Sequence, residues 1–389
     1  MNAKNKVLGL ALCVGCLALG ITHAADATKK MSLDDSKAVL EKLKTDGKIK
    51  QYKLDPGAEA GLLKLDLSTS GIIDLAPLKG MPLEWLHIDG SDHSPSMVVT
   101  LAGLEGMPLK ELSLQGNVAL EDISAIKGAP LKVFKISPTH GGMPKVKDIS
   151  ALKGMDLVEV GIVGPVEDLS PLAGMKLEKV RIGTASKDVN VLKGMHLKSV
   201  QLSGAVTNIS GLQGMQPASL SFHGANELSD FTPLKGMKMT GLDLFGTKIS
   251  DLSPLEGMPL TFLQLGGTEV KDIAPLKGMK LTSLALEGPK VTVTDIGPLA
   301  SMPLKSIDLR LRNLIDISAL KGLPLRDLNI TESKVTDISA LVECKELVQV
   351  RLPVGVTDFS PLRKLTKLQS INGAPVADFW KKLDVEKGK

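Results

Sequence analysis

Three serines in this sequence are each followed three residues later by a lysine, the spacing of the nucleophile and its neighbouring base in penicillin-binding proteins. The pairs are Ser124 with Lys127, Ser150 with Lys153, and Ser318 with Lys321. All three occupy the same place in a repeating segment, whereas an active serine needs a single strained and buried setting. The companion patterns S-D-N and K-T-G are absent, as are G-x-S-x-G, a Walker loop and H-E-x-x-H. The sequence therefore predicts a protein that is not an enzyme.

An aspartate recurs at one position of almost every repeating segment, and such a ladder of carboxylates could in principle bind calcium. Its members are Asp74, Asp122, Asp148, Asp168, Asp188, Asp230, Asp251, Asp272, Asp295, Asp316, Asp337 and Asp358. Two repeats carry Thr100 and Asn208 there instead. Calcium needs several oxygen ligands per ion, whereas Asp, Asn and Thr share the ability to accept hydrogen bonds from backbone N–H groups at the start of a turn. We therefore expect capping side chains, and neither a metal site nor any other cofactor.

Methionine recurs three residues after the central Leu or Ile of ten repeats, where copper binding would need clustered thioethers. The methionines are Met81, Met107, Met155, Met175, Met195, Met215, Met237, Met258, Met279 and Met302. Ala129, Leu323 and Leu365 occupy the same position in other repeats, so we interpret it as a core position. Cys344 occupies it too, and no histidine follows His223 in the chain. We expect Cys344 to be buried and unreactive.

These periodic positions belong to one segment, DISPLKGMPLxxLxL in varying form, that recurs about every twenty-one residues. Its central Leu or Ile marks 14 copies, which lie 20 to 26 residues apart. That period is typical of leucine-rich repeats and excludes the longer helical-pair repeats. The LxxLxL part alternates inward and outward residues like a strand, and proline after the aspartate blocks a long helix. We expect an α/β solenoid with a curved parallel β-sheet on the concave face, short 3₁₀ turns on the convex face, and helical caps at both ends.

The repeat resembles those of bacterial leucine-rich-repeat proteins of the internalin type, and the resemblance covers roughly Leu62 to Ile371. It implies a protein that binds a partner through the concave sheet. One position departs from the family pattern. Where the family has an inward Asn, the regular copies have Thr247, Thr268 and Ser333, with Asn117 an exception. We therefore expect the hydroxyls to replace an asparagine ladder only in part.

The ends of the chain differ from the array. Residues 1–24 combine two lysines with the apolar run VLGLALCVGCLALGI and Thr-His-Ala, which predicts a secretory signal peptide cut near Ala24. An uncleaved anchor is disfavoured because the run is shorter than the roughly 20 residues of a bilayer span. A lipoprotein signal at Cys16 is disfavoured because Cys13 stands where such signals have Leu. The prediction is a secreted or periplasmic protein with no membrane span in the mature chain.

The mature chain divides into three parts in this interpretation. Residues 25–61 form an N-terminal helical cap, residues 62–373 the array of about 14 repeats, and residues 374–389 a C-terminal cap helix with a polar tail. A capping box at Ser32 predicts a first helix from about Leu33 to Asp46. A second, short amphipathic helix is expected from Val376 to Leu383.

Charge and aromatic content restrict the class of partner. The chain has 47 Lys and Arg against 43 Asp and Glu, and loss of the two lysines in the leader leaves 45 against 43. Such a balance provides no electrostatic surface for nucleic acid or an anionic membrane. Aromatic residues make up only 3% of the chain, which also weakens a carbohydrate-binding interpretation, since sugar sites use stacked rings.

Outward strand positions are the candidates for a binding face, and anchors there should be aromatic or arginine side chains. The candidate residues are Trp85, His87, His223, Asp243, Phe245, Phe262, Gln264, Asp308 and Arg310. Phe245 and Phe262 lie on consecutive strands, where they could form one exposed apolar patch. The alternative is that these aromatics are isolated surface residues, or that Trp85 packs on the terminal cap. His93 and His140 lie in two long insertions, which are either functional loops or tolerated surface insertions.

Taken together, the sequence predicts a non-catalytic, extracytoplasmic protein–protein interaction module. The alternative is an envelope-associated structural scaffold that binds glycan or cell-wall polymer.

Overall fold

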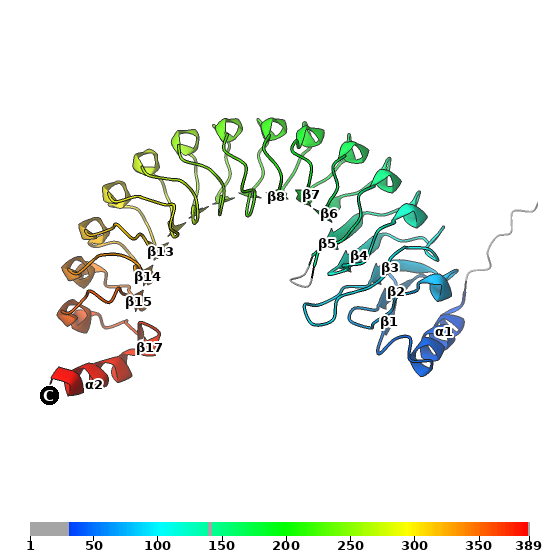
Figure 1. Ribbon diagram of the computed structural model, residues 1–389, viewed down its shortest axis with the longest axis horizontal. Coiled ribbons are helices and arrows are strands. Elements are labelled where there is room, and N and C mark those ends of the chain that lie inside the picture. The colour runs from blue at the N-terminus through cyan, green and yellow to red at the C-terminus, as the bar shows by residue number, and fades with distance from the viewer. Residues whose placement is uncertain (1–30, 139–141, 388–389) are drawn as a thin grey trace, which may run out of the picture.

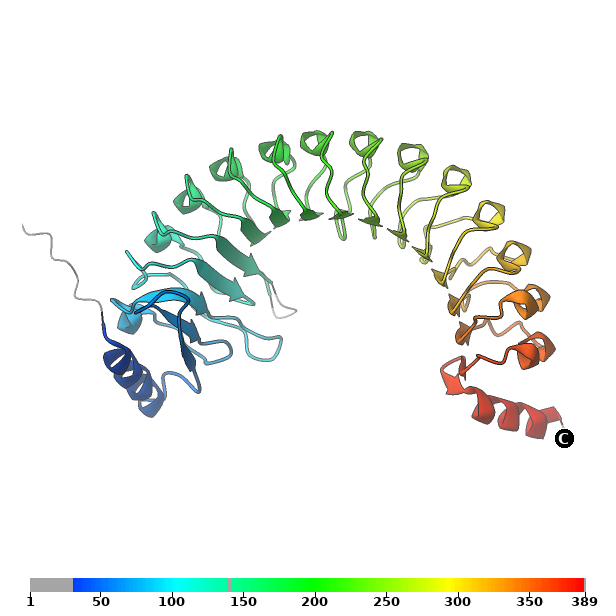
Figure 2. The same ribbon diagram turned by 180° about the vertical axis from the view of Figure 1, so that it is seen from behind.

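The computed structural model describes residues 31–138 and 142–387 of the chain. The predicted signal peptide with Cys16, and His140 of the second insertion, lie outside the described residues. The rest is a single arch of stacked repeats, with the strands on its inner side and the short turns on its outer side (Figure 1). Viewed from behind, helix α1 (Leu33–Thr45) and helix α2 (Val376–Lys387) stand at the two ends of the arch (Figure 2).

Each repeat contributes one strand, and within the described residues the strands form one 17-stranded sheet. The strands are β1 (Lys53–Pro56), β2 (Leu63–Asp66), β3 (Leu83–His87), β4 (Glu111–Gln115), β5 (Val133–Ser137), β6 (Glu159–Gly164), β7 (Lys179–Thr184), β8 (Ser199–Gly204), β9 (Ser219–Ser221), β10 (Gly241–Asp243), β11 (Phe262–Gln264), β12 (Ser283–Ala285), β13 (Ser306–Asp308), β14 (Asp327–Asn329), β15 (Gln349–Arg351), β16 (Ser370–Ile371) and β17 (Ala374–Pro375). Strands β2 to β16 run parallel in chain order. The first and last strands pair antiparallel with their neighbours.

The return path contains a short 3₁₀ turn on the convex side in thirteen repeats, as the proline and the short spacing predict, whereas the repeat of Leu104 has only simple turns there. These turns are Ala76–Leu78, Ser124–Ile126, Ser150–Leu152, Ser170–Leu172, Asn190–Leu192, Ser210–Leu212, Thr232–Leu234, Ser253–Leu255, Ala274–Leu276, Gly297–Leu299, Ser318–Leu320, Ser339–Glu343 and Ser360–Lys364. Because the turns are wider than the strands, stacking the repeats bends the array toward the sheet. The predicted fold class is therefore confirmed, including the parallel sheet, the 3₁₀ turns and the two terminal helices.

The aspartate ladder caps these turns. In one repeat the backbone N–H of Ser253 donates to Oδ1 of Asp251 at 2.8 Å, and the Ser253 hydroxyl donates to Oδ2 at 2.7 Å. Asn208 and Thr100 accept in the same way from the backbone two residues further on. These hydrogen bonds lower the pKa of Asp148, Asp168, Asp251 and Asp337 below the ordinary value, and the bond from the backbone N–H contributes more than the bond from the serine hydroxyl. The pKa of Asp230 is lowered as well, and there the Thr232 hydroxyl is the largest cause.

The core is a continuous stack of inward side chains from α1 to the last repeat. Leu242 and Leu263 are typical of the inward strand position, with exposed fractions of 0% and 1%. All ten periodic methionines are buried, and Cys344 is completely so, which confirms that this is a core position. In contrast, the hydroxyls at the inward Asn position bond only within their own repeat, as Thr268 does to the carbonyl of Leu265 at 2.6 Å. They therefore do not continue a ladder from one repeat to the next.

The two ends of the stack are covered in different ways. At the N-terminus, Ser32 and Asp35 form a reciprocal capping box, and Leu40 and Leu43 of α1 are buried against the first repeats. At the C-terminus, Phe379 of α2 meets the ring of Phe359 edge-on with centroids 5.2 Å apart. These apolar contacts protect the outer faces of the first and last repeats from water.

Candidate partner-binding face

The concave face carries one uninterrupted row of outward side chains, here called the central row. Strand pairing places its members directly opposite one another from β2 to β15. They are Asp66, His87, Ser113, Lys135, Gly161, Arg181, Gln201, Ser221, Asp243, Gln264, Ala285, Asp308, Asn329 and Arg351. Residues two positions before and two positions after form flanking rows on the same face, because side chains on a strand alternate with a period of two.

The predicted aromatic group near the start of the array is present on β3. The rings of Trp85 and His87 stack with centroids 3.5 Å apart. Nε2 of His87 lies 2.9 Å from Oε1 of Glu111, and its Nδ1 lies 3.9 Å from Oδ2 of Asp89. The sequence interpretation missed these two carboxylates, although both occupy the flanking rows. One edge of the histidine is thus held between acids while its face covers the indole.

The second predicted group is centred on Asp243 of β10. The rings of His223 and Phe245 stack with centroids 4.6 Å apart, and Nδ1 of His223 lies 3.4 Å from Oδ2 of Asp243. The other oxygen of that carboxylate accepts from the backbone N–H of Phe245 at 2.9 Å. Ser221 on β9 donates its hydroxyl to the same side chain at 3.1 Å. Asp243 therefore links two strands and positions both rings.

Phe262 does not belong to this group, so the predicted patch of Phe245 and Phe262 is wrong. Phe262 pairs with Gly241, four residues before Phe245, which separates the two residues by about 13 Å along the strand direction. The exposed fraction of Phe262 is 44%, whereas Phe245 is half-buried under its contact with His223. Phe262 stands alone as an exposed ring in one flanking row, and Phe245 lies in the other.

The last predicted residues form polar contacts along the C-terminal half of the face. Gln264 donates its amide to Glu287 at 3.2 Å and accepts from the backbone N–H of Gly266. Nε of Arg310 lies 3.0 Å from both carboxylate oxygens of Asp308. The pKa of the guanidinium is raised above its ordinary value, mainly by these hydrogen bonds. Asn329 donates to the same carboxylate at 3.2 Å.

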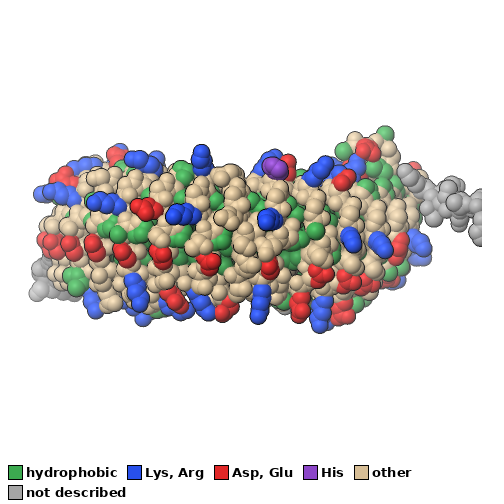
Figure 3. Space-filling view, turned by 90° about the horizontal axis from the view of Figure 1, so that it is seen from above, with side chains coloured by type: hydrophobic (Ala, Val, Ile, Leu, Met, Phe, Trp, Pro, Cys, Tyr) green, Lys and Arg blue, Asp and Glu red, His purple; other side chains and the backbone are tan. Residues whose placement is uncertain are grey.

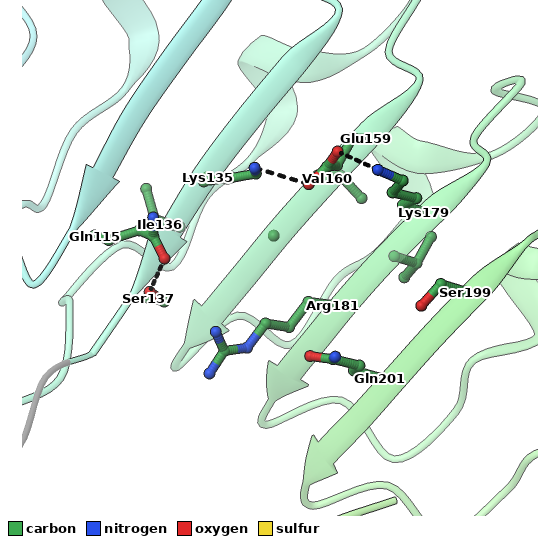
Figure 4. A pocket seen from close by; sticks show the side chains of 12 residues that line it. Gln115, Lys135, Ile136, Ser137, Glu159, Val160, Lys179, Arg181, Ser199 and Gln201 are labelled. Carbon is green, nitrogen blue, oxygen red and sulfur yellow. Dashed lines mark hydrogen bonds and ion pairs between the residues drawn. The ribbon is translucent and has the colours of Figure 1, made fainter. Parts of the chain in front are cut away.

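A feature that the sequence interpretation missed lies at the centre of the face. Gly161 occupies the central row on β6, between Lys135 of β5 and Arg181 of β7, and its missing side chain leaves a pocket of about 260 Å³ (Figure 4). We call this the Gly161 pocket; Glu159, Lys179, Ser199 and Gln201 also line it. A glycine at an outward strand position, flanked by cations in the neighbouring repeats, is the signal that could have revealed it.

The convex face has a different character. Acidic and basic side chains are interspersed along its whole length without a large patch of one sign (Figure 3). The serines of the three S-x-x-K matches, Ser124, Ser150 and Ser318, are exposed on these turns. The hydroxyls of Ser124 and Ser318 donate hydrogen bonds to the capping aspartates. None of the three is buried or strained as a nucleophile would be.

No group of three or more His, Cys, Asp or Glu side chains within residues 31–138 and 142–387 is placed to hold a metal ion. Among the same residues, neither helix is long and apolar enough to cross a membrane.

Comparisons with known proteins agree with the geometry at the level of the fold. No family model matches the chain, and neither does any curated protein. Among solved structures, the internalin InlF of Listeria monocytogenes is similar with a TM-score of 0.53 and 21% identity, over 68% of this chain and 87% of that one. Internalin C2 of the same organism matches with a TM-score of 0.38 and 28% identity over 41% and 74%, and the functional domain of InlJ with 0.34 and 16% over 67% and 72%. The likeness to InlF identifies the fold of this chain as a leucine-rich-repeat solenoid.

Proposed function

We propose that this protein is a non-catalytic protein-interaction module that acts outside the cytoplasm and holds a protein partner against its concave face. The observation that carries the proposal is the central row. Its side chains change in charge and size from strand to strand, whereas the inward positions beside them remain Leu, Ile, Val or Phe. Uniform inward residues serve packing, and variation along one continuous surface serves the recognition of a particular partner.

The way in which the face is built also favours binding over mere solubility. His87, Asp243 and Arg310 are each held by neighbours on adjacent strands or on their own strand. Side chains that are already ordered lose little conformational entropy when a partner covers them. Phe262, which is exposed on the same face, provides an apolar anchor of the kind that concentrates binding energy.

Site-specific photo-cross-linking tests the proposed binding face. A benzoylphenylalanine residue is introduced at Ser221 or Ala285 of the central row and, as a matched control, at Lys277 or Lys321 on the convex turns. The variants are expressed in the parent cells, irradiated, and analysed by mass spectrometry. We expect one protein to be captured from the concave positions only, and competition by the unlabelled protein. Equal capture from the convex positions, or no protein adduct from the concave ones, would contradict the proposal.

The location outside the cytoplasm needs a separate measurement. The proposal includes the signal peptide of residues 1–24, so the mature chain should begin near Ala25. Intact-mass analysis of protein recovered from the periplasm or the medium checks this. An intact leader, or a lipid attached to Cys16, would contradict it.

The finer assignment of the repeats to the internalin type belongs to the same proposal. It is supported by the DISPLKGMPLxxLxL pattern of the sequence.

A further inference from the structure

The Gly161 pocket combines an opening in the side-chain layer with an excess of positive charge. Its lining includes three cations, Lys135, Lys179 and Arg181, and one carboxylate, Glu159. Three positive charges against one negative charge leave an excess of two. Gln115, Ser199, Gln201 and Ser221, which lie nearby on β4, β8 and β9, are uncharged. Glu111 is the one acid on these three strands, and it lies 2.9 Å from His87 on the side of β4 away from the pocket.

The single carboxylate is already engaged by two of the cations. Oε1 of Glu159 lies 2.8 Å from Nζ of Lys135, and Oε2 lies 3.5 Å from Nζ of Lys179. Burial alone would raise the pKa of Glu159, but the bonds to Lys135 and Lys179 outweigh burial and hold the pKa below its ordinary value. Glu159 thus remains ionised between the two lysines, and its two oxygens point away from the third cation (Figure 4).

Arg181 is the cation of this pocket that has no partner among the described residues. Its guanidinium reaches from β7 toward β6 (Figure 4), and Arg181 pairs with Gly161 across these two strands. It forms no hydrogen bond or ion pair within the part of the chain that the structure describes. A guanidinium presents a planar fork of donors that matches a carboxylate in two parallel hydrogen bonds. Nearby Gln201 adds an amide on the next strand, opposite Arg181 in the central row.

We propose that the Gly161 pocket receives an aspartate or glutamate side chain of the protein partner, with Arg181 as the residue that binds its carboxylate. This inference rests on the proposed function and specifies part of its binding site. The missing side chain at Gly161 allows the carboxylate to approach the guanidinium between the strands. The surplus charge of the lining supplies the complementarity, and the one carboxylate of the lining, Glu159, is engaged by Lys135 and Lys179.

The size of the pocket favours a side chain over a free ligand. Its volume of about 260 Å³ lies below the range of about 300–1,000 Å³ that is typical of small-molecule sites. Nucleic acid would need a basic stripe along the face, whereas the C-terminal half of the central row carries Asp243 and Asp308. A short acidic segment of a protein fits both the size and the local charge.

Peptide selection against the whole protein tests this site. A random dodecapeptide phage library is panned on the wild-type protein, with counter-selection on the variant Gly161→Leu, and the enriched peptides are synthesised with their Gln and Asn analogues. The substitution fills the pocket and is compatible with the fold, because a Cβ at Gly161 would lie 3.5 Å from Cγ of Lys135, an ordinary contact. We expect the enriched peptides to contain Asp or Glu and to bind about tenfold or more weakly when that residue becomes an amide.

Two matched controls separate the pocket from the rest of the face. Arg181→Gln should weaken the peptide about tenfold or more, whereas Arg351→Gln, which removes an exposed arginine from the other end of the same row, should not. Gly161→Leu should abolish binding, whereas Gly241→Leu on β10 should leave it unchanged, since a Cβ there makes only a 3.4 Å contact with Ser219. The affinity should also fall as salt rises.

Several outcomes would overturn the inference. These are an enrichment without acidic residues, equal losses in Arg181→Gln and Arg351→Gln, and binding of acetate or inorganic phosphate in the pocket as tightly as the peptide. Concave-face cross-links to a partner whose affinity is unaffected by Arg181→Gln would reject the Gly161 pocket and leave the proposed function standing. Failure of the cross-linking itself would reject the proposed function.

Discussion

The imidazole of His223 lies on the ring of Phe245, with centroids 4.6 Å apart and planes inclined by 14°. This stack joins the ends of β9 and β10 on the concave face and does not include Phe262. Substitutions of residues in contact have coupled effects on stability, whereas the effects of substitutions at distant residues are additive. Double-mutant cycles should therefore detect coupling between His223 and Phe245 but not between Phe245 and Phe262.

We expect His223→Ala and Phe245→Ala to show a coupling of about 0.5 kcal/mol in the free energy of unfolding, at the low end for aromatic pairs because His223 is exposed. Phe245→Ala and Phe262→Ala should be additive. Urea denaturation of the single and double variants measures both quantities. A coupling between the two phenylalanines as large as that within the stack would show that they share a patch after all.

The capping aspartates make stability depend on pH in acid. Their lowered pKa values mean that the folded state holds the charged form more firmly than the unfolded chain does, whose aspartates titrate near 3.8. The stability that the caps contribute is fully present above the pKa of the unfolded chain, and it is lost as the pH falls through the lower pKa values of the folded state. We expect the melting temperature to fall steeply below about pH 4, measured by circular dichroism from about pH 6 to about pH 2.5.

Single substitutions at one cap test the cause. Asp148 accepts from the backbone N–H of Ser150 at 2.7 Å. Asp148→Ala should cost about 1 kcal/mol of stability at neutral pH, as the loss of a cap does elsewhere, whereas Asp148→Asn keeps an acceptor and should cost less. Equal losses in both variants would mean that charge, and not capping, is what the position requires.

Removal of divalent metal should not change the protein. In the repeat of Asp251 both carboxylate oxygens accept from Ser253, so they already have partners within the turn. We therefore expect the same melting temperature with and without EDTA at neutral pH. A drop on addition of the chelator would instead indicate an ion bound along the aspartate ladder.

Cys344 should resist thiol reagents in the folded protein. It is completely buried, and its Sγ lies 3.2 Å from the carbonyl of Leu320. Burial is the largest influence on its pKa and raises it, so little thiolate forms near neutral pH. We expect Ellman's reagent to label Cys344 only in denaturant, with the labelled peptide identified by mass spectrometry. Stoichiometric labelling without denaturant would show that the last repeats open readily.

The C-terminal helix should stabilise the repeats next to it. Phe379 packs on Phe359, and the guanidinium of Arg363 lies 4.2 Å from the centre of the Trp380 ring. We expect Phe379→Ala to cost about 1–2 kcal/mol, since the ring is only partly buried. Val385→Ala, on an exposed part of α2, is the control and should have little effect.

Deletion of the helix should act locally, because stability in a solenoid depends on neighbouring repeats. Hydrogen exchange should become faster in β15 and β16 and remain unchanged in β5 to β8. Uniformly faster exchange along the array, or no change near the deletion, would be inconsistent with a cap that protects only the last repeats.

Much of the fold could be predicted because the same pattern of inward, turn and capping residues recurs in almost every repeat. Inward leucines two residues apart predict a strand, and proline after a capping aspartate predicts a short turn, so each copy supports the others. The central row followed from this alternation alone. The capping box at Ser32 predicted α1 to within one residue of its observed end at Thr45.

The candidate site was harder to predict, for two different reasons. Aligning the inward Leu242 and Leu263 would have shown that Phe262 precedes its leucine and Phe245 follows its own, so that error lay in comparing strands without their register. The Gly161 pocket depends on the reach of side chains across three strands. No repeat contains it by itself, and the sequence does not say that Glu159 bonds to the lysines and leaves Arg181 without a partner in residues 31–138 and 142–387.

The parallel pairing of the strands also makes the concave face a molecular ruler. Four strand-to-strand steps separate β6, which carries Gly161, from β10 beside the stack of His223 and Phe245. At about 4.8 Å a step this is about 19 Å, or roughly six residues of extended chain. Backbone hydrogen bonds set that interval. Substitutions of outward side chains therefore change which partner groups are bound at each strand, but not the distance between the strands. Any segment that touches both places must be long enough to cover it.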